Sequence, residues 1–444
     1  MVDILVLGAT GFTGRLITRY LYAHKDRGSK FTFAVAARSK SKLDDLVSEL
    51  SLDNSVPVIL VDVTKPEQVD AAVNDVKVVI NTVGPYMRWG TPVVAACVKR
   101  GLHYVDLAGE PFWIRDIITE YDYAATRTHS IIIPASGLDS VPTDISAYLA
   151  NKTLKAVVGP DTAIENSTSA WAIRGGFSGG TLGTAIASME EVPKAKLKAS
   201  MKDHYLSPVE GLPSPRPRLV YTLPVVSPTV RGTFFPMVGV NRAVLQRTWG
   251  LHELEARRQS THADTNAVSQ PDAQAERKRL TYGQQFKYDE FIVMPNVAIG
   301  VVVAIAFAIG FASLTYIAPL RWLVKRLVTQ PGQGPSDEQM KDGWFKVTNI
   351  TSSVPTAATP RTYVKSIMYG QGDPGYLATA VMISEAALAL VFDTNKLPAL
   401  ARRGGVLTPM SALGDVLIER LKETGRFRFT SDIVDARGRT ETTR

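Results

Sequence analysis

Cysteine is nearly absent from this sequence, which has a single one, Cys97, among 444 residues. An internal disulfide is therefore excluded, and a lone thiol suits a reducing compartment. Cys97 lies in the apolar stretch TPVVAACV (residues 91–98), where we expect a small buried side chain rather than a reactive thiol. Histidine is also scarce. The six histidines show no metal-ligand spacing, so the sequence predicts no metal site.

A strong excess of one charge is lacking as well. The formal net charge is +8, from 50 Lys and Arg against 42 Asp and Glu, and the basic residues are scattered along the chain. We therefore expect no nucleic-acid partner, whereas phosphorylated ligands or anionic membrane surfaces are compatible with this charge. Hydrophobic residues make up 45% of the chain, an ordinary globular value, and the length suits two or three domains.

The glycine turn GATGFTG (residues 8–14) follows directly on the apolar stretch VDILVL (residues 2–7) and leads into an amphipathic stretch. This context predicts a strand, a dinucleotide-binding turn and a helix. The first glycine allows the tight turn, the second lets the backbone approach a pyrophosphate, and the third allows the helix to pack closely. A strand from residue 2 leaves no room for a cleaved signal or transit peptide. The expected cofactor contacts in this turn are Gly8, Thr10, Gly11, Phe12, Thr13 and Gly14.

Strand-like and helix-like stretches alternate through the first 150 residues. Further strands are expected at residues 31–36, 56–61, 76–81, 103–107 and 130–134, and helices are expected to start near Ser41, Pro66, Pro92 and Phe112. This alternation predicts an α/β fold with an N-terminal Rossmann domain, in which the parallel sheet is doubly wound. Right-handed crossovers would place all the strand ends on one rim, where ligands bind.

The residues that follow the second and fourth expected strands indicate the type of cofactor. An Asp or Glu that would meet a free ribose 2′-hydroxyl is missing after the second strand, where the chain reads Arg38-Ser39-Lys40. Arg38 could pair with a 2′-phosphate, with Ser39 adding a hydrogen bond, so NADP(H) is favoured. A solvated loop cation is the alternative for Arg38. Asp62 could meet the adenine or could serve a turn or helix cap. Three residues after the fourth strand are expected near the ribose and nicotinamide: Thr82, Val83 and Gly84.

These and later motifs resemble one family. The set comprises GATGFTG, AAR (36–38), NTVGPY (81–86), YVDLAGE (104–110), GLDSVPTD (137–144), GGFSGGT (175–181), GPS (334–336), GWFKV (343–347) and GDPGY (372–376). It resembles the saccharopine dehydrogenase-like oxidoreductases, most closely the branch with the trans-acting enoyl reductases and the lipid-droplet saccharopine dehydrogenase-like protein. The resemblance implies an NADP-type Rossmann domain, a second α+β domain and, in some members, reduction of lipid or polyketide chains. True saccharopine reductases have a GLDPG-type sequence where this chain has GLDSVP, which leaves lysine metabolism as the lesser alternative.

We expect three parts in the chain: an NADP-binding Rossmann domain at residues 1–138, an α+β substrate or dimerisation domain at residues 139–430, and a polar tail at residues 431–444. In the second domain a strand at residues 171–174 leads into the glycine-rich turn, followed by a helix whose first turn could hold an anion or simply complete the turn. Residues 204–236 contain seven prolines and should be irregular or edge structure. Residues 253–278 read as a surface helix or an exposed insert. A homodimer is compatible with this organisation.

A long uncharged segment at residues 291–320 distinguishes the second domain. Residues 297–318 are mostly apolar, and such a helix, at about 1.5 Å per residue, could cross a bilayer core of roughly 30 Å. Arg321, Trp322, Lys325 and Arg326 follow it, as an interfacial anchor requires. A helix buried between domains or in a dimer is the alternative. Family-like motifs on both sides favour monotopic insertion over a span, on the cytosolic face of the endoplasmic reticulum or on a lipid droplet.

Catalytic residues are the least certain part of this prediction. A reductase needs a proton donor beside the nicotinamide, and Tyr86, Asp139 and Ser140 lie on segments expected at the rim. Ordering a loop or capping a helix is the alternative role for Asp139 and for Asp144. Tyr148 and Lys152 form a Tyr-x-x-x-Lys pair like that of short-chain dehydrogenases, although one such match is expected by chance. The resulting hypothesis is an NADPH-dependent reductase of an apolar, lipid or polyketide-type substrate at a membrane. The alternative is a non-catalytic NADP-binding protein at the same surface.

Overall fold

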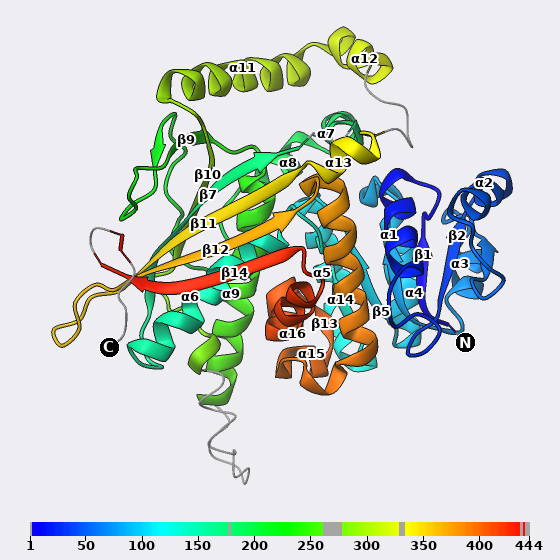
Figure 1. Cartoon of the computed structure of the whole chain (residues 1–444), viewed down its shortest axis with the longest axis horizontal. Coiled ribbons are helices and arrows are strands. Elements are labelled where there is room, and N and C mark those ends of the chain that lie inside the picture. Colours follow the sequence, from blue (N-terminus) through cyan, green and yellow to red (C-terminus); the bar gives the residue numbers. More distant parts are fainter. Residues whose placement is uncertain (1, 176–178, 261–277, 328–333, 436–437, 440–444) are drawn as a thin grey trace.

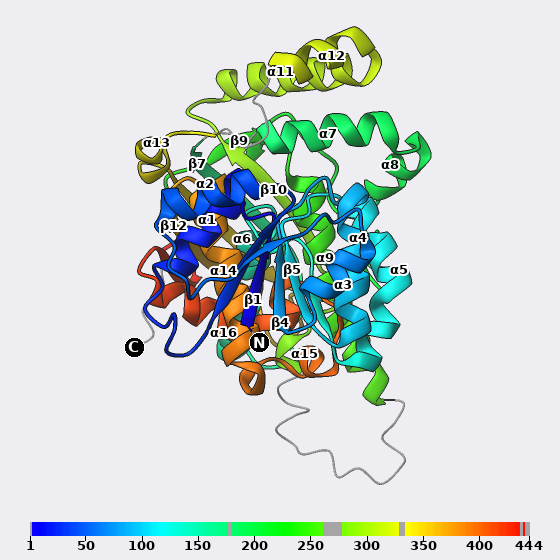
Figure 2. The ribbon, with the colours of Figure 1, turned by 90° about the vertical axis from the view of Figure 1, so that its right-hand side faces the viewer.

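The computed structural model of the chain describes residues 2–175, 179–260, 278–327, 334–435 and 438–439, and Figures 1 and 2 show it in two perpendicular views. Two seven-stranded sheets form its framework. The first has the strand order β13-β6-β5-β4-β1-β2-β3, and every pairing in it is parallel. Its strands are β1 (Val2–Leu7), β2 (Phe33–Ala37), β3 (Val58–Leu60), β4 (Val76–Asn81), β5 (His103–Asp106), β6 (Ile131–Ile133) and β13 (Gly405–Val406). The predicted doubly wound parallel sheet is confirmed, because the order from β3 to β6 is that of a dinucleotide-binding fold.

Helices cover both faces of the first sheet. The helices that connect its strands are α1 (Phe12–Tyr22), α2 (Lys40–Leu50), α3 (Pro66–Ala72), α4 (Tyr86–Arg100) and α5 (Pro111–Thr128). Helices α3, α4 and α5 pack in a row on one face, and α1 lies on the other face. Strand β2 is fully buried and β1 is buried from Ile4 onwards, which explains why they read as uninterrupted apolar runs rather than as alternating ones.

One expected helix start is wrong. Helix α4 begins at Tyr86 rather than near Pro92, which lies inside it. The carboxylate of Glu110 accepts hydrogen bonds from the backbone amides of Tyr86 and Met87, both at 2.8 Å, and so caps this helix from outside. Proline inside a helix removes one backbone hydrogen bond. The external cap and the buried contacts of α4 outweigh that loss.

The second sheet is mixed and has the order β14-β12-β11-β7-β10-β9-β8. Its strands are β7 (Ile164–Arg174), β8 (Tyr221–Thr222), β9 (Arg231–Phe234), β10 (Lys287–Val293), β11 (Trp344–Ser353), β12 (Tyr363–Gln371) and β14 (Phe427–Val434). Strands β7 and β10 pair in parallel and the other pairings are antiparallel. The α+β character expected for this part is confirmed. The proline-rich stretch 204–236 contributes only the two short strands β8 and β9 at the edge, as expected.

Helices of the second part pack against this sheet and against the first one. They are α6 (Val141–Val157), α7 (Gly179–Glu191), α8 (Lys194–Ser200), α9 (Val238–Ser260), α11 (Val297–Tyr316), α12 (Ala318–Leu327), α13 (Asp337–Lys341), α14 (Thr379–Phe392), α15 (Ala399–Arg403) and α16 (Pro409–Glu423), with short helical turns at Pro374–Ala378 and Thr394–Lys396. Helix α6 packs on β11 and β12. Most of the expected insert at residues 253–278 lies outside the described residues, beyond the end of α9.

The chain returns to the first sheet near its C-terminus. Helix α14 packs against α1, β4 and β5, so that it lies between the two sheets (Figure 1). Strand β13 then pairs with β6 through Gly405 and Val406. The expected division at residue 138 stays a prediction, but these later residues complete the first sheet. At the other expected limit, β14 continues to Val434, inside the stretch 431–444 expected as a tail.

Helix α11 extends across one end of the molecule, above β9 and α7 in Figure 1. Its mean hydropathy is 2.6, yet only 11% of it is buried, and its exposed apolar side chains lie all around the helix. The exposed set includes Ile299, Val302, Val303, Ile305, Phe307, Ile309 and Phe311. Burial between domains, one alternative for this segment, is therefore wrong for the described chain. A second long apolar helix, Pro374–Phe392, is instead 78% buried in the core.

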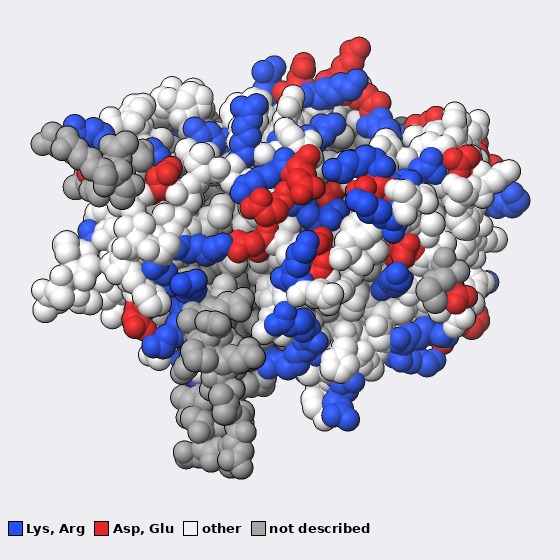
Figure 3. All heavy atoms as spheres, turned by 60° about the horizontal axis from the view of Figure 1, so that its bottom comes forward, with Lys and Arg blue, Asp and Glu red and all other residues white. Residues whose placement is uncertain are grey.

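The opposite face of the molecule differs in character. Lys and Arg side chains alternate there with Asp and Glu side chains across the surface (Figure 3). Such interspersed charge is ordinary for a protein surface in water.

Candidate active site at the rim of the first sheet

The glycine turn between β1 and α1 has the geometry that its sequence predicts. Gly8 has a φ of +84°, and its amide donates a hydrogen bond to the carbonyl oxygen of Ala36 at 2.8 Å. A Cβ on Gly14 would lie 2.2 Å from the carbonyl oxygen of Gly8, so only glycine allows α1 to pack this closely. The hydroxyl of Thr82, at the end of β4, donates to the carbonyl oxygen of Leu7 at 2.9 Å and so holds the turn against the neighbouring strand.

The N-terminus of α1 offers backbone donors at this turn. Gly11 is its N-cap and has no side chain to accept from the first amides of the helix, which leaves them for an anionic ligand. Thr10 and Thr13 are half-buried beside it. The ring of Phe12 packs edge-on against Tyr376, 4.6 Å between centroids, and lies against Gly334. Phe12 could therefore meet a cofactor through its amide, while its side chain joins the two parts of the chain.

The predicted 2′-phosphate residues follow β2. Arg38 is exposed directly after the strand. The hydroxyl of Ser39 accepts from the amide of Lys42 at 3.4 Å and caps α2, a role that the sequence analysis did not assign to it. Asp62 accepts from the amide and the hydroxyl of Thr64 at 3.0 and 2.8 Å, and this hydrogen bonding holds the pKa of Asp62 below its usual value. The turn role of Asp62 is thus observed, and its contact with adenine stays a prediction.

Tyr86, one catalytic candidate, is fixed by the backbone. Its hydroxyl donates to the carbonyl oxygen of Asn81 at 3.1 Å and accepts from the amide of Leu107 at 3.1 Å. Burial raises its pKa well above the ordinary value. These bonds order the loop after β4, where Val83 and the open position of Gly84 lie, and they favour a structural role for the tyrosine.

Asp106, at the end of β5, joins the ends of β5 and β6 and was missed as a site residue. Its carboxylate accepts from the amides of Ala108 and Ala135 and from the hydroxyl of Tyr104, all between 2.8 and 2.9 Å. Burial raises its pKa to about 7. Its place at the end of an apolar strand in the YVDLAGE motif is the signal that could have identified it. Its full set of donors indicates that Asp106 builds the rim rather than reacting there.

Asp139, the second catalytic candidate, lies in the loop between β6 and α6. Its carboxylate is half-buried and makes no hydrogen bond or ion pair with another residue of the described chain, and a Cβ on Gly109 would lie 3.4 Å from its Oδ2. Burial raises the pKa of Asp139 to about 6. The third candidate, Ser140, is buried, and its hydroxyl donates to the carbonyl oxygen of Asp139 at 2.7 Å. Of the three catalytic candidates, Asp139 is therefore the one whose side chain is held by no other residue of the described chain.

The remaining candidates from the sequence, Asp144 and the Tyr148 and Lys152 pair, make contacts that hold the fold together. Asp144 accepts from the hydroxyl of Thr248 at 2.9 Å and from the amide of Met410 at 3.0 Å, so it ties α6 to α9 and α16. Burial raises its pKa to about 7. Lys152 forms an ion pair with Asp415 at 2.5 Å, and Tyr148 is buried in the core two turns along α6. The Tyr-x-x-x-Lys pair thus lies away from the strand ends.

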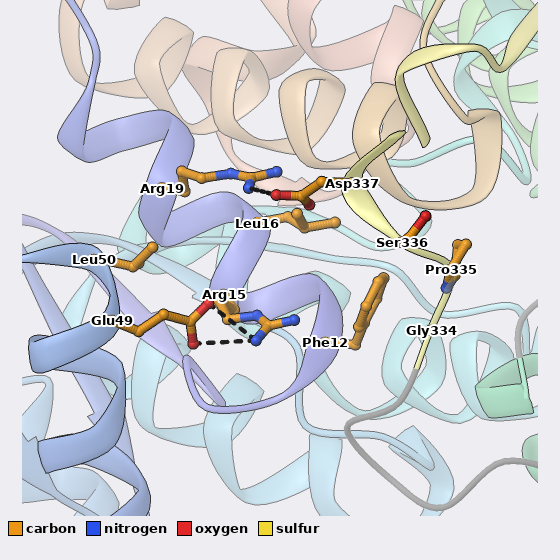
Figure 4. A pocket seen from close by; sticks show the side chains of 10 residues that line it. All are labelled: Phe12, Arg15, Leu16, Arg19, Glu49, Leu50, Gly334, Pro335, Ser336 and Asp337. Carbon is orange, nitrogen blue, oxygen red and sulfur yellow. Dashed lines mark hydrogen bonds and ion pairs between the residues drawn. The ribbon is translucent and has the colours of Figure 1, made fainter. Parts of the chain in front are cut away.

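Motifs from the far end of the chain meet beside α1. A hollow of about 510 Å³ lies between α1, the end of α2 and the loop 334–337 (Figure 4). Two ion pairs line it, Arg15 with Glu49 at 3.1 Å and Arg19 with Asp337 at 2.8 Å. It is lined by Phe12, Arg15, Leu16, Arg19, Glu49, Leu50, Gly334, Pro335, Ser336 and Asp337.

Glycines of the later motifs allow close backbone approach. A Cβ on Gly175 would lie 2.6 Å from Oδ2 of Asp373, and one on Gly343 would lie 2.5 Å from the Cα of Asp373. Three motifs that are distant in sequence therefore meet at this aspartate. Residues 176–178 of the expected glycine-rich turn lie outside the described residues. Nowhere in the described ranges do three or more His, Cys, Asp or Glu gather as metal ligands.

Comparisons with known proteins agree with this geometry. Residues 4–133 match the model of the saccharopine dehydrogenase NADP binding domain. A Mycobacterium tuberculosis H37Rv protein assigned as a trans-acting enoyl reductase is 33% identical over 453 residues, which cover 95% of this chain and 96% of the relative. The chain belongs to the saccharopine dehydrogenase-like oxidoreductases. The trans-acting enoyl reductase of Mycobacterium bovis BCG is 30% identical over 446 residues, again covering 95% and 96% of the two chains.

Among solved structures, apo saccharopine dehydrogenase (L-Glu forming) from Saccharomyces cerevisiae covers 98% of this chain and 100% of its own, with a TM-score of 0.48 and 13% identity. As a saccharopine dehydrogenase-like oxidoreductase, the chain is an NADP-dependent enzyme. The residues present fit the cofactor. A Cβ on Gly8 or Gly14 would clash with neighbouring atoms of the protein, so the turn needs both glycines, and no side chain of the N-cap occupies the first amides of α1, which would bind the pyrophosphate.

Proposed function

We propose that this oxidoreductase reduces an activated carbon-carbon double bond in a lipid or polyketide-type chain, with NADPH as the hydride source. The names of its mycobacterial relatives support this reaction class. The observation that carries the proposal is Asp139, an acid without a partner in the described chain, whose pKa is raised to about 6 at the rim where β6 ends. In this fold the strands from β4 to β6 border the nicotinamide half of the site.

Different residues of the chain have different roles in this reaction: cofactor binding, proton donation and positioning of the loops. The first amides of α1 would hold the pyrophosphate of NADPH, and Arg38 would hold its 2′-phosphate. The cofactor, when bound, would supply the hydride for the substrate carbon farther from the activating carbonyl. Asp139 in its protonated form donates a proton to the carbon nearer that carbonyl and is left as a carboxylate, which takes up a proton from water before the next cycle. The other carboxyl groups of the rim, Asp106 and Glu110, hold the loops around it.

The reaction is tested by NADPH consumption with enoyl thioesters and with lipid extracts. We expect the wild-type protein to turn over an enoyl substrate, and Asp139→Asn to bind NADPH normally while turnover falls by at least about 100-fold. Asp45→Asn, at an exposed carboxylate on α2, is the matched control and should leave turnover unchanged. Tight NADPH binding by the wild type without turnover of any substrate would contradict the proposal and favour the non-catalytic alternative.

We infer that α11 holds the enzyme on a membrane or lipid-droplet surface, on its cytosolic side. Support comes from its exposed apolar side chains and from the three cations that follow it, Arg321, Lys325 and Arg326. An apolar helix of 20 residues in contact with water is costly, and a lipid phase removes that cost. The motifs before and after α11 belong to one body, which favours insertion into one leaflet (Figure 1). Deletion of residues 297–318 should release the protein from the membrane fraction. Unchanged fractionation would contradict the inference.

A further inference from the structure

Two neighbouring carboxylates at the end of α7 face different parts of the molecule. Glu190 pairs with two cations of α12, Arg321, whose Nε is 3.6 Å from Oε1, and Lys325. Glu191 accepts a hydrogen bond from Nε of Arg88 on α4 at 2.7 Å. Helix α7 lies between the apolar helix α11 and the first sheet in both ribbon views (Figures 1 and 2). One helix end therefore connects the expected membrane element with a helix of the active-site rim.

Arg321 is central to the membrane side of this connection. Its Nη1 donates to the carbonyl oxygens of Leu314 and Thr315 at 2.7 and 3.0 Å and so closes the C-terminus of α11. Its Nε is buried and has no hydrogen-bond partner within the described ranges. At 3.6 Å, Glu190 is attracted by charge but does not satisfy this donor. The guanidinium thus keeps a donor that a better-placed anion would satisfy.

Helix α12 has the composition of a helix that lies at a lipid surface. Trp322 and Leu323 are exposed apolar side chains, with 60% and 44% of their surface accessible. Lys325 and Arg326 are exposed as well, and the Arg326 guanidinium lies 5.4 Å from the centre of the Trp322 ring. Apolar side chains beside cations suit the boundary between acyl chains and anionic headgroups.

We propose that anionic lipid headgroups compete with Glu190 for Arg321 and Lys325, so that docking on an anionic membrane detaches α12 from α7. This inference rests on the proposed membrane association of α11. The competition is balanced. The ion pair of Glu190 with Lys325, whose side chain is 43% exposed, shifts an equilibrium by at most about fivefold, and attraction of one Lys to an anionic surface is worth about fivefold as well. Membrane charge can therefore decide which partner Lys325 keeps.

Replacement of Glu190 by lipid headgroups affects the active-site rim through the neighbouring Glu191. Arg88 lies in the first turn of α4, which begins at Tyr86 immediately after the loop expected to meet the nicotinamide. While Glu190 holds α12, the end of α7 is attached at both sides. Once headgroups bind the cations of α12, the contact of Glu190 with α12 is lost and the contact of Glu191 with Arg88 remains. The structure thus links the charge of the lipid surface to the position of α7 beside the active site.

Vesicle sedimentation of the full-length protein tests the competition. Neutral phosphatidylcholine vesicles are compared with vesicles that also contain phosphatidylglycerol. Glu190→Gln should raise the preference for anionic vesicles by about fivefold, because the exposed Lys325 is then free for headgroups. Glu191→Gln is the matched control, since its partner is Arg88, and should leave that preference unchanged. Equal preferences for the Glu190→Gln and wild-type proteins would overturn the inference, as would failure of the wild type to bind either vesicle.

A distance measurement tests the detachment itself. The only native cysteine, Cys97, is buried, so labels attach to introduced cysteines. Gly183→Cys on α7 and Leu323→Cys on α12 are both exposed positions, and no atom lies within 4 Å of a Cβ built on Gly183. The distance between the labels should increase on anionic vesicles and stay constant on neutral ones. A constant distance on both kinds of vesicle would overturn the inference.

These readouts do not depend on catalysis. NADPH binding and turnover are measured in the same preparations without vesicles. Loss of turnover in every preparation would contradict the proposed reaction while the sedimentation and distance results still decide the competition. Conversely, an active enzyme whose labels never separate would retain its proposed reaction and overturn the coupling.

Discussion

Replacing Asp139 by Asn should stabilise the protein while it removes turnover. Burial raises the pKa of Asp139 from 3.8 to about 6, and a difference of about two pKa units corresponds to roughly 3 kcal/mol between the two protonation states. Above pH 6 the carboxylate is charged in both the folded and the unfolded protein, so the folded state bears this cost. Below pH 3.8 it is neutral in both and the cost disappears. The stability gained by Asp139→Asn is therefore present above pH 6 and is lost as the pH falls from 6 towards 3.8.

The gain can be measured as a melting temperature. For 444 residues, an unfolding entropy of about 2.1 cal/mol/K per residue converts roughly 3 kcal/mol into a shift of about 3 °C. Scanning fluorimetry at about pH 8 and about pH 4 gives the comparison, with Asp45→Asn as the exposed control that should change neither value. A loss of stability at pH 8, or an equal shift at both pH values, would refute the assignment of Asp139 as a half-buried acid that no residue of the described chain hydrogen-bonds.

Three further predictions concern the cofactor site. Gly14→Ala should cost about 1–3 kcal/mol of stability and abolish NADPH binding, because its methyl group would overlap the carbonyl oxygen of Gly8. Gly239→Ala, at an exposed position with free space around it, is the control and should be tolerated. Denaturant unfolding and fluorescence titration with NADPH compare the two variants, and normal NADPH affinity of Gly14→Ala would contradict the prediction. Thr82→Val should lose about 1 kcal/mol with the hydrogen bond to the turn, measured by denaturant unfolding. Arg38→Glu should weaken NADPH binding by at least about tenfold and spare NADH, seen in titrations with both cofactors; equal weakening of both would refute its contact with the 2′-phosphate.

Local features of this molecule could be predicted from its sequence, and long-range ones could not. The turn from Gly8 to Gly14 is recognisable because backbone geometry restricts those positions to glycine whatever surrounds them. Helix α4 was misplaced because Pro92 resembles a helix start, while the true cap is the carboxylate of Glu110, 24 residues after Tyr86. A cap supplied from another loop leaves no local pattern.

The candidate site shows the same limit. Asp139 and Asp106 both read as polar residues after apolar strands, and the sequence cannot distinguish the acid that receives three hydrogen bonds from the one that receives none in the described chain. Their difference arises from tertiary packing. The same holds for Ser39, whose position next to Arg38 suggests cofactor binding while its hydroxyl caps α2. Helix α11 and the helical stretch Pro374–Phe392 are both long and apolar enough to cross a membrane, and packing makes one of them surface and the other core.

Strand β13 completes the first sheet, although it is synthesised long after the other strands of that sheet. A ribosome delivers β1 to β6 long before residues 405 and 406, so the edge of β6 stays unpaired through most of translation. Helix α14, which covers β4 and β5, is also made late. Helix α11 leaves the ribosome before both of them. The nascent chain therefore presents its most apolar helix to its surroundings while the cofactor-binding sheet is still incomplete.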